Sequence, residues 1–312
     1  MTRFFLPEGQ LLTTSENQLA CADESGLLRA MECEQILEGR VTLCDGSHNL
    51  LVSLGKFTGL IPREEAALGI SEGSTREIAI LSRVGKAVCF TVEGLEYHGG
   101  ILSPRLSRRR AQTLALEHFM SVLTPGMVIP ASVTHLEPFG AFVDIGCGVP
   151  SMIGIENISV SRISNPAERF AVGQNIFAAV LGVRPDLGRV ILSHKELLGT
   201  WQENAAQFTM GMTVSGTVRG IKDYGAFVEL APNLSGLAEL RDDLQEDDRV
   251  SVYIKAVVPE RMKIKLLVID RLPREKAPLP FRYFITEGTL TSWHYAPDCC
   301  GKPCAETLFG AE

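Results

Sequence analysis

The chain has 312 residues, 45% of them hydrophobic, and it carries 30 lysines and arginines against 37 acidic residues, for a formal net charge of −7. This composition excludes a mostly disordered chain, and the length suggests two domains of about 150 residues or three smaller ones. The acidic balance excludes a globally basic surface, so any nucleic acid must be held at local patches.

Neither membrane insertion nor secretion is indicated by the sequence. The longest apolar stretches, such as residues 176–183, are far shorter than the ~20 residues that cross a bilayer. Residues 1–10 contain no apolar signal core, so we expect a cytoplasmic protein. Five of the eight cysteines are scattered singly through apolar segments, which favours free thiols over a disulfide framework.

The sequence predicts three segments in the N-terminal part of the chain: an extension, a weak copy of a repeat, and a linker. Residues 1–33 form the extension, which we predict to be partly helical. Residues 34–106 predict a degenerate copy of the repeat described below, because they contain an opening Gly39, a V-x-L-G strand end and a Gly59-Leu60 pair but no aromatic pair. Residues 107–124 lack Gly-rich turns and predict a helical linker.

Two clear copies of one unit follow, at 125–197 and 210–270. Residues 126–145 read GMVIPASVTHLEPFGAFVDI and residues 211–230 read GMTVSGTVRGIKDYGAFVEL, a constant offset of 85 positions. This offset aligns Phe139 with Tyr224 and Phe142 with Phe227. Period-two alternation and short strands broken by Gly, Asn and Pro predict a small closed barrel for each copy. A second helical linker is predicted at 198–209.

Residues 271–312 begin with a Pro- and charge-rich linker and end in a tail that contains His294, Cys299, Cys300 and Cys304. Three thiols and one imidazole can form a tetrahedral zinc site, but adjacent cysteines depart from the usual C-x₂₋₄-C spacing. The alternatives are therefore a zinc site and reduced surface thiols in a loose tail. We favour the thiols and predict no metal and no other cofactor.

The aromatic pairs carry the candidate chemistry. Phe142 shares a strand face with Asp144, and Phe227 shares one with Glu229. Burying an unpaired carboxylate costs several kcal/mol, so we expect both carboxylates, and the rings beside them, to face water. Exposed rings on a strand face can stack unpaired bases, at ~1–3 kcal/mol per base. The alternative is that the rings cover a neighbouring loop or helix.

Cations beside this face would hold phosphates, although each alone is also compatible with a solvated surface charge. The run Arg108-Arg109-Arg110 either contacts RNA or simply begins the linker helix. The predicted RNA-binding residues are Phe139, Phe142, Arg189, Lys195, Arg219, Tyr224, Phe227, Lys255 and Lys263.

The two clear copies resemble a known family. Both copies contain the run (F/Y)-G-A-F-V-(D/E)-(I/L), and the copy at 125–197 continues with G-R-V-I-L-S-H-K-E. These motifs are similar to those of the S1 RNA-binding domain, the repeat of the bacterial small-subunit ribosomal protein S1. The resemblance is close over 125–197, good over 210–270 and loose over 34–106. It implies a mainly β protein of tandem five-stranded OB-fold barrels, joined by short helical linkers, that binds single-stranded RNA. The implied contacts are Phe139, Phe142 and Arg189 in one copy and Tyr224, Phe227 and Lys263 in the other.

The sequence departs from the family pattern in three places. Many members carry a histidine where this chain has Asn157 and Glu239, so the family's contact at this position is not carried over to this chain. The connection at 240–248 is short and acidic, so we expect that edge to lie outside the RNA track. The copy at 34–106 lacks the aromatic residues, and we expect it to be mainly architectural.

The sequence indicates a binding protein rather than an enzyme. It contains no phosphate loop, no nucleophile elbow and no H-E-x-x-H motif, so we predict no enzymatic activity and no small-molecule substrate. The main hypothesis is binding of single-stranded mRNA in translation, with the small ribosomal subunit as a partner and no membrane. The alternatives are a transcription or RNA-decay accessory factor and a protein-binding scaffold with weak RNA affinity. Tandem copies favour RNA, since linked weak sites gain avidity on one strand.

Overall fold

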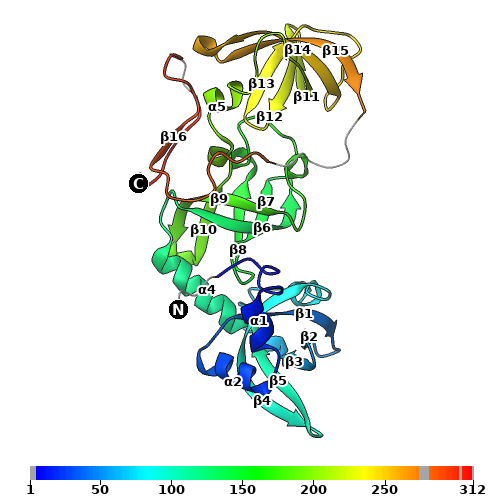
Figure 1. Cartoon of the computed structure of the whole chain (residues 1–312), viewed down its shortest axis with the longest axis vertical. Coiled ribbons are helices and arrows are strands. Elements are labelled where there is room, and N and C mark those ends of the chain that lie inside the picture. The colour runs from blue at the N-terminus through cyan, green and yellow to red at the C-terminus, as the bar shows by residue number, and fades with distance from the viewer. Residues whose placement is uncertain (1–4, 274–280, 302–303, 311–312) are drawn as a thin grey trace. The chain divides into compact units, whose positions relative to one another are not determined.

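The computed structural model of the protein describes residues 5–273, 281–301 and 304–310. Within these residues the strands form three closed five-stranded barrels and one two-stranded sheet (Figure 1). The predicted fold class, mainly β with tandem five-stranded barrels, is thus confirmed. The chain groups into two compact units, of which the first comprises Met1–Val122, Pro130–Ser132 and Asp144–Pro150 and the second comprises Leu123–Ile129, Val133–Val143 and Ser151–Glu312.

The first barrel closes in the strand order β1-β2-β3-β5-β4. Its strands are β1 (Leu37–Cys44), β2 (Leu50–Leu54), β3 (Phe57–Ile61), β4 (Ala87–His98) and β5 (Ile101–Ser107). A 3-10 turn, η1 (Arg63–Glu65), and a short helix, α3 (Ile78–Leu81), lie between β3 and β4. This barrel shows that the degenerate repeat copy folds in the same way as its more regular relatives.

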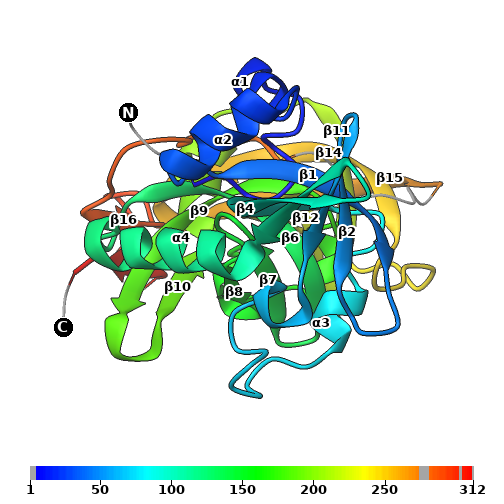
Figure 2. The same ribbon diagram turned by 90° about the horizontal axis from the view of Figure 1, so that it is seen from below.

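Helices flank the first barrel on both sides in the chain. The N-terminal extension contains α1 (Ser15–Ala20) and α2 (Glu24–Glu32), which pack together and contact β1 and β4 (Figure 2). The side chains of Thr14 and Asp23 cap these two helices by accepting hydrogen bonds from backbone N–H groups of the first turn. The long helix α4 (Arg108–Val122) follows β5 and lies within the predicted linker 107–124.

The middle barrel closes in the order β10-β8-β7-β6-β9. Its strands are β6 (Val128–Glu137), β7 (Gly140–Asp144), β8 (Pro150–Gly154), β9 (Asn175–Arg184) and β10 (Arg189–Ser193). Its 3-10 turns are η2 (Ile155–Asn157), η3 (Pro166–Glu168), η4 (Pro185–Leu187) and η5 (Lys195–Leu198). The helix α5 (Trp201–Ala205) then lies within the predicted linker 198–209 and begins with a capping box between Thr200 and Glu203.

The last barrel closes in the order β11-β12-β13-β15-β14. Its strands are β11 (Thr213–Lys222), β12 (Gly225–Ala231), β13 (Leu234–Ala238), β14 (Arg249–Val258) and β15 (Lys263–Leu272), with η6 (Pro259–Arg261) between the last two. In each barrel the third and fifth strands run parallel, as between β13 and β15, and the other registered pairs are antiparallel. The three barrels therefore share one topology.

The barrels are closed around cores of alternating residues. Along β15 every second residue from Ile264 to Val268 is buried, and the residues between them face outward. Gly59 and Gly236 occupy the same place on the third strands of two barrels. A Cβ at these positions would lie 2.5 Å from Leu106 and 2.6 Å from Leu266, so only glycine allows the core leucine to approach the strand.

The C-terminal segment is folded, in contrast to the loose tail expected from the sequence. It contains a small hairpin of β16 (Ser292–His294) and β17 (Glu306–Leu308), and within the second unit it adds backbone hydrogen bonds to the middle barrel. The amide of Val128 donates to the carbonyl of Gly288 at 3.0 Å, and the rings of Phe281 and Tyr283 pack against His194. The sequence pattern missed this segment because its apolar residues have no regular period.

Candidate nucleic-acid interface

The two predicted aromatic pairs have the same geometry in the middle and last barrels. The ring centroids of Phe139 and Phe142 are 6.1 Å apart with an interplanar angle of 85°, and the rings of Tyr224 and Phe227 have the same separation and angle. Phe139 is 55% exposed and Tyr224 is 68% exposed, whereas the other two rings are half-buried. Each barrel therefore presents one free ring that is held edge-on by a second ring.

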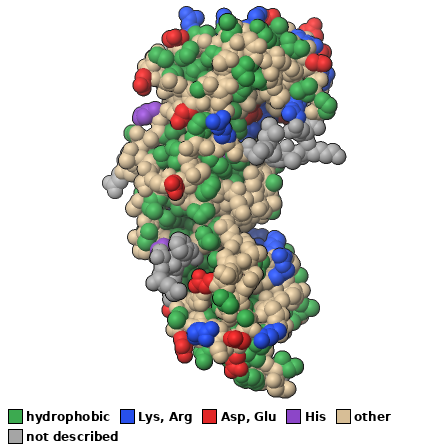
Figure 3. Space-filling view, viewed as in Figure 1, with side chains coloured by type: hydrophobic (Ala, Val, Ile, Leu, Met, Phe, Trp, Pro, Cys, Tyr) green, Lys and Arg blue, Asp and Glu red, His purple; other side chains and the backbone are tan. Residues whose placement is uncertain are grey.

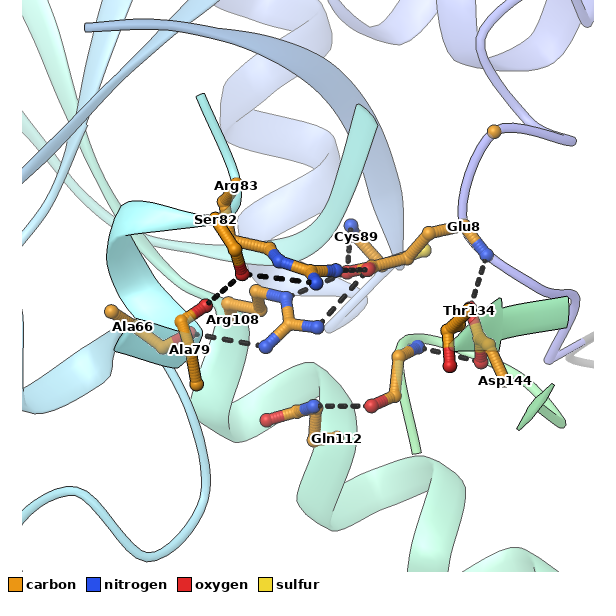
Figure 4. Close-up of polar contacts among 12 residues, drawn as sticks. Glu8, Ala66, Ala79, Ser82, Arg83, Cys89, Arg108, Gln112, Thr134 and Asp144 are labelled. Carbon is orange, nitrogen blue, oxygen red and sulfur yellow. Dashed lines mark hydrogen bonds and ion pairs between the residues drawn. The ribbon is translucent and has the colours of Figure 1, made fainter. Parts of the chain in front are cut away.

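The carboxylates beside these rings do not face water, contrary to the prediction. Asp144 is buried, and its carboxylate accepts hydrogen bonds from the amides of Glu8 (2.7 Å), Gly146 (2.8 Å) and Gly148 (2.9 Å) (Figure 4). Burial and the charge of Glu8 raise the pKa of Asp144 to about 7. Glu229 is also buried. Compensated carboxylates can be placed inside a protein, so neither residue marks a solvent-facing side.

Arg219 does not contribute a free cation, contrary to the prediction. Its guanidinium binds the carboxylates of Glu229 and Glu168 and lies 3.1 Å from Oδ1 of Asp247. Arg169, which is buried, binds the other oxygen of Glu229. Three carboxylates satisfy this arginine, so we assign Arg219 a structural role between the middle and last barrels.

The remaining predicted cations differ in how free they are. The side chains of Arg189 and Lys263 are exposed and form no ion pair or hydrogen bond within the part of the chain that the structure describes. Nζ of Lys195 donates to Oδ1 of Asn157 at 2.9 Å, and Nζ of Lys255 lies 2.8 Å from Oε1 of Glu239. This ion pair lowers the pKa of Glu239. Of these four predicted cations, Arg189 and Lys263 are thus the two whose side chains have no partner in the described part of the chain.

The strand register reveals one cation that sequence reasoning missed. Arg184 on β9 stands directly opposite Arg189 on β10, and both side chains are exposed. Two like charges at directly opposed positions repel each other unless an anion lies between them. The signal was available in the sequence, because the two arginines flank the turn P-D-L-G symmetrically.

A row of outward-facing residues also extends across the last barrel. Phe227 on β12 is registered with Leu237 on β13, which is registered with exposed Lys265 on β15. In the middle barrel the corresponding parallel register joins Met152 and Ile191, whose side chains are 39% and 44% exposed. The middle and last barrels therefore each carry an aromatic ring and apolar side chains on one outer face. A cation lies in this row of residues in the last barrel and beside it in the middle barrel.

The first barrel lacks the aromatic residue that the other two barrels carry on the second strand. Its second strand turns Leu51 and Ser53 outward instead of an aromatic residue. The run Arg108-Arg109-Arg110 begins α4, and each of the three binds a carboxylate, of Glu8, Glu65 and Glu34 respectively. The structure therefore supports the second reading of this basic run, in which it begins the linker helix.

The molecule has no continuous basic surface on the face drawn in Figure 3, where lysine and arginine side chains lie interspersed with acidic ones. In the C-terminal segment, Nδ1 of His294 lies 3.4 Å from Oε2 of Glu306. Across residues 5–273, 281–301 and 304–310, no group of three or more His, Cys, Asp or Glu side chains is placed to hold a metal ion. No helix among these residues is long and apolar enough to span a membrane.

Comparison with known proteins shows that the middle barrel is similar to a known domain family. Residues 123–195 match the family model of the S1 RNA binding domain. The "Small ribosomal subunit protein bS1" of Leuconostoc lactis is 33% identical over 189 residues, a match that covers 55% of this chain and 44% of that relative. The protein of the same name from Staphylococcus aureus strain COL is 28% identical over 266 residues, covering 80% of this chain and 66% of the relative.

A solved structure of a multidomain protein with nucleic acid binding domains from Streptococcus pneumoniae aligns with 12% identity and a TM-score of 0.25, covering 76% of this chain and 73% of that one. The chain spans less than two thirds of the length of the two curated relatives described above.

Proposed function

Residues 123–195 match the S1 RNA binding domain, and from this premise we propose that the protein binds single-stranded RNA through the outer faces of its middle and last barrels. The proposed role is in translation, as an S1-like component that holds mRNA near the small ribosomal subunit. This role places the protein in the cytoplasm. The relatives named small ribosomal subunit protein bS1 support the proposal.

The observation that carries the proposal is the repeated ring pair. Phe139 is 55% exposed and Tyr224 is 68% exposed, and each is held by an edge contact with a second ring. An unpaired base can stack on a ring that is exposed and held in this way. The same pair occurs on two barrels of one chain, so one strand can engage both, and the linked sites gain avidity. Duplexes bury the base faces that stacking requires, which favours single-stranded RNA.

The charge distribution supports weak sequence preference and a shallow salt dependence. Arg184, Arg189, Lys263 and Lys265 are exposed cations on the strands of the ring faces, and acidic side chains are interspersed over the surface, so few phosphates are neutralised on these faces. For single strands the logarithm of the affinity falls by ~0.7 per phosphate contact for each tenfold rise in salt. We expect these four cations to contribute about 3 or less to the slope.

Co-sedimentation of the purified chain with small ribosomal subunits, at low and at high salt, tests this role. We expect the protein to sediment with subunits that carry an unstructured mRNA and to be released by salt together with RNA. Binding that survives both ribonuclease and high salt would instead indicate a protein-binding scaffold. RNA binding without any ribosome association would indicate an accessory factor in transcription or RNA decay.

A further inference from the structure

A cleft of about 750 Å³ lies between the middle and last barrels, within the second compact unit. Its volume is in the range of pockets that hold a small organic ligand such as a nucleotide. Phe227 of the proposed RNA face lines it from the last barrel, and Tyr295 lines it from the C-terminal segment. The loop that follows β8 and η2 contributes Arg162 from the middle barrel. The cleft is therefore built by three parts of the chain.

Two cations without partners line the cleft, one from each barrel. The side chains of Arg162 and Lys222 are exposed, and neither side chain makes an ion pair or hydrogen bond with any residue that the structure describes. The arginine that is also in the cleft, Arg219, is already satisfied by carboxylates. An anion entering the cleft would thus meet Arg162 and Lys222 first.

Phe227, the ring that lines the cleft, has an open side that Phe142, its counterpart in the middle barrel, lacks. In the middle barrel the imidazole of His135 lies 6.3 Å from the ring of Phe142, centroid to centroid. At the corresponding position the last barrel has Gly220, which stands directly opposite Phe227 in the strand register. The only described heavy atom within 4 Å of where a Cβ of Gly220 would lie is Oε1 of Glu246, at 3.9 Å, so space is left beside Phe227 where the middle barrel has an imidazole.

The acidic residues of the cleft are mostly neutralised, and the same contacts fix its walls. Glu168 accepts hydrogen bonds from the amide and hydroxyl of Ser164 (2.7 and 2.8 Å) and binds Arg219. Asp247 is also paired with Arg219. Buried Asn233 accepts a hydrogen bond from the amide of Val160, which lines the cleft, at 2.9 Å and so joins the two barrels. The cleft is preorganised rather than dependent on closure around a ligand.

We propose that this cleft binds one nucleotide of the RNA strand, with the base on the open side of Phe227 and its phosphate between Arg162 and Lys222. The proposal rests on the proposed function and extends it, because it adds a residue of the middle barrel to the site of the last barrel. It also revises the expectation that the acidic edge of the last barrel lies away from RNA. Asp247 of that edge is paired, and Glu246 lines the cleft without an ion pair or hydrogen bond to another described residue.

Fluorescence anisotropy of the full chain with a labelled oligouridylate of about 20 nucleotides tests the cleft. We expect Arg162→Ala to weaken binding by about tenfold and to lower the salt slope by about 0.7. The matched control is Arg29→Ala, which removes one exposed arginine from α2 and should leave the affinity within about twofold. Unchanged thermal unfolding of both variants confirms that they are folded.

A double-mutant cycle distinguishes one shared nucleotide from two separate contacts. If Arg162 and Phe227 hold the same nucleotide, the Arg162→Ala and Phe227→Ala effects should fall short of additivity by about threefold or more. The combination of Arg162→Ala with Phe142→Ala, in the other barrel, should be additive. Additivity in both cycles would overturn the shared nucleotide.

The outcomes separate this inference from the function on which it rests. If the unmodified chain does not bind the oligomer, the proposed function fails. If it binds and Phe227→Ala weakens binding, but Arg162→Ala behaves like Arg29→Ala, only the cleft is refuted. As an independent measurement, Glu246→Gln should strengthen binding by about twofold to threefold, since it removes the unpaired carboxylate that repels phosphate. A weaker complex in that variant would contradict the proposed path of the phosphate.

Discussion

Removal of the two most exposed rings, by Phe139→Ala together with Tyr224→Ala, should weaken RNA binding without unfolding either barrel. These rings are 55% and 68% exposed, and each touches its half-buried neighbour only edge-on, at 6.1 Å between centroids. Their truncation therefore leaves little cavity, and we expect a change in the free energy of unfolding of no more than about 0.5 kcal/mol each. Phe142 and Phe227 are less suitable, because their truncation would also remove packing.

The magnitude follows from the geometry. A base stacked on an aromatic side chain contributes ~1–3 kcal/mol, and a ring with a neighbour against it should lie in the lower half of that range. The two rings belong to separate barrels, so their effects should add to about 2–4 kcal/mol, or roughly thirtyfold to a thousandfold in Kd.

Fluorescence anisotropy with a uridine-rich oligomer measures this change, and circular dichroism melting serves as the control for folding. A Kd within about threefold of the unmodified protein, with melting unchanged, would mean that these rings do not bind bases and that the RNA site lies on another face.

Three further predictions concern charges. Arg184→Ala combined with Arg189→Ala should weaken binding mainly at low salt and reduce the salt slope by about 1.4, measured by anisotropy over a salt series; an unchanged slope would contradict phosphate binding by this pair. Glu8→Gln should lower the melting temperature by an amount equivalent to about 3 kcal/mol, because it leaves the buried guanidinium of Arg108 uncompensated, whereas equal melting temperatures would refute that role. Burial lowers the pKa of His194 to about 4, and its ring nitrogens bind the carbonyl of Ile158 and the hydroxyl of Tyr283. The unfolded chain therefore takes up a proton near pH 6.5 that the folded protein does not bind, and stability is lost as the pH falls from about 6.5 to 4, by up to about 3 kcal/mol. In His194→Gln that loss should shrink, as measured by denaturant unfolding at several pH values.

Much of the fold could be predicted from the sequence because it depends on local pattern. Period-two alternation marks which residues of a strand enter a core, and the repeat of Gly-Ala-Phe-Val at 140 and 225 shows that the same barrel is built twice. The aromatic pairs were identified for the same reason, since Phe139 and Tyr224 stand in turns before equivalent strands. The structure places both rings on the surface with identical pair geometry.

Only the tertiary structure decided which charges are free. Asp144 is compensated by the amide of Glu8, 136 positions away in the chain, and Glu229 by Arg169, which is 60 positions away. A strand pattern contains no information on such distant partners, so it assigned both carboxylates to water and left Arg219 for RNA. Whether a charge binds an external ligand depends on whether the fold has already placed an opposite charge beside it. That placement is a property of the packed chain, and it is why Arg162, an inconspicuous residue in the sequence, becomes a candidate ligand-binding residue beside Phe227.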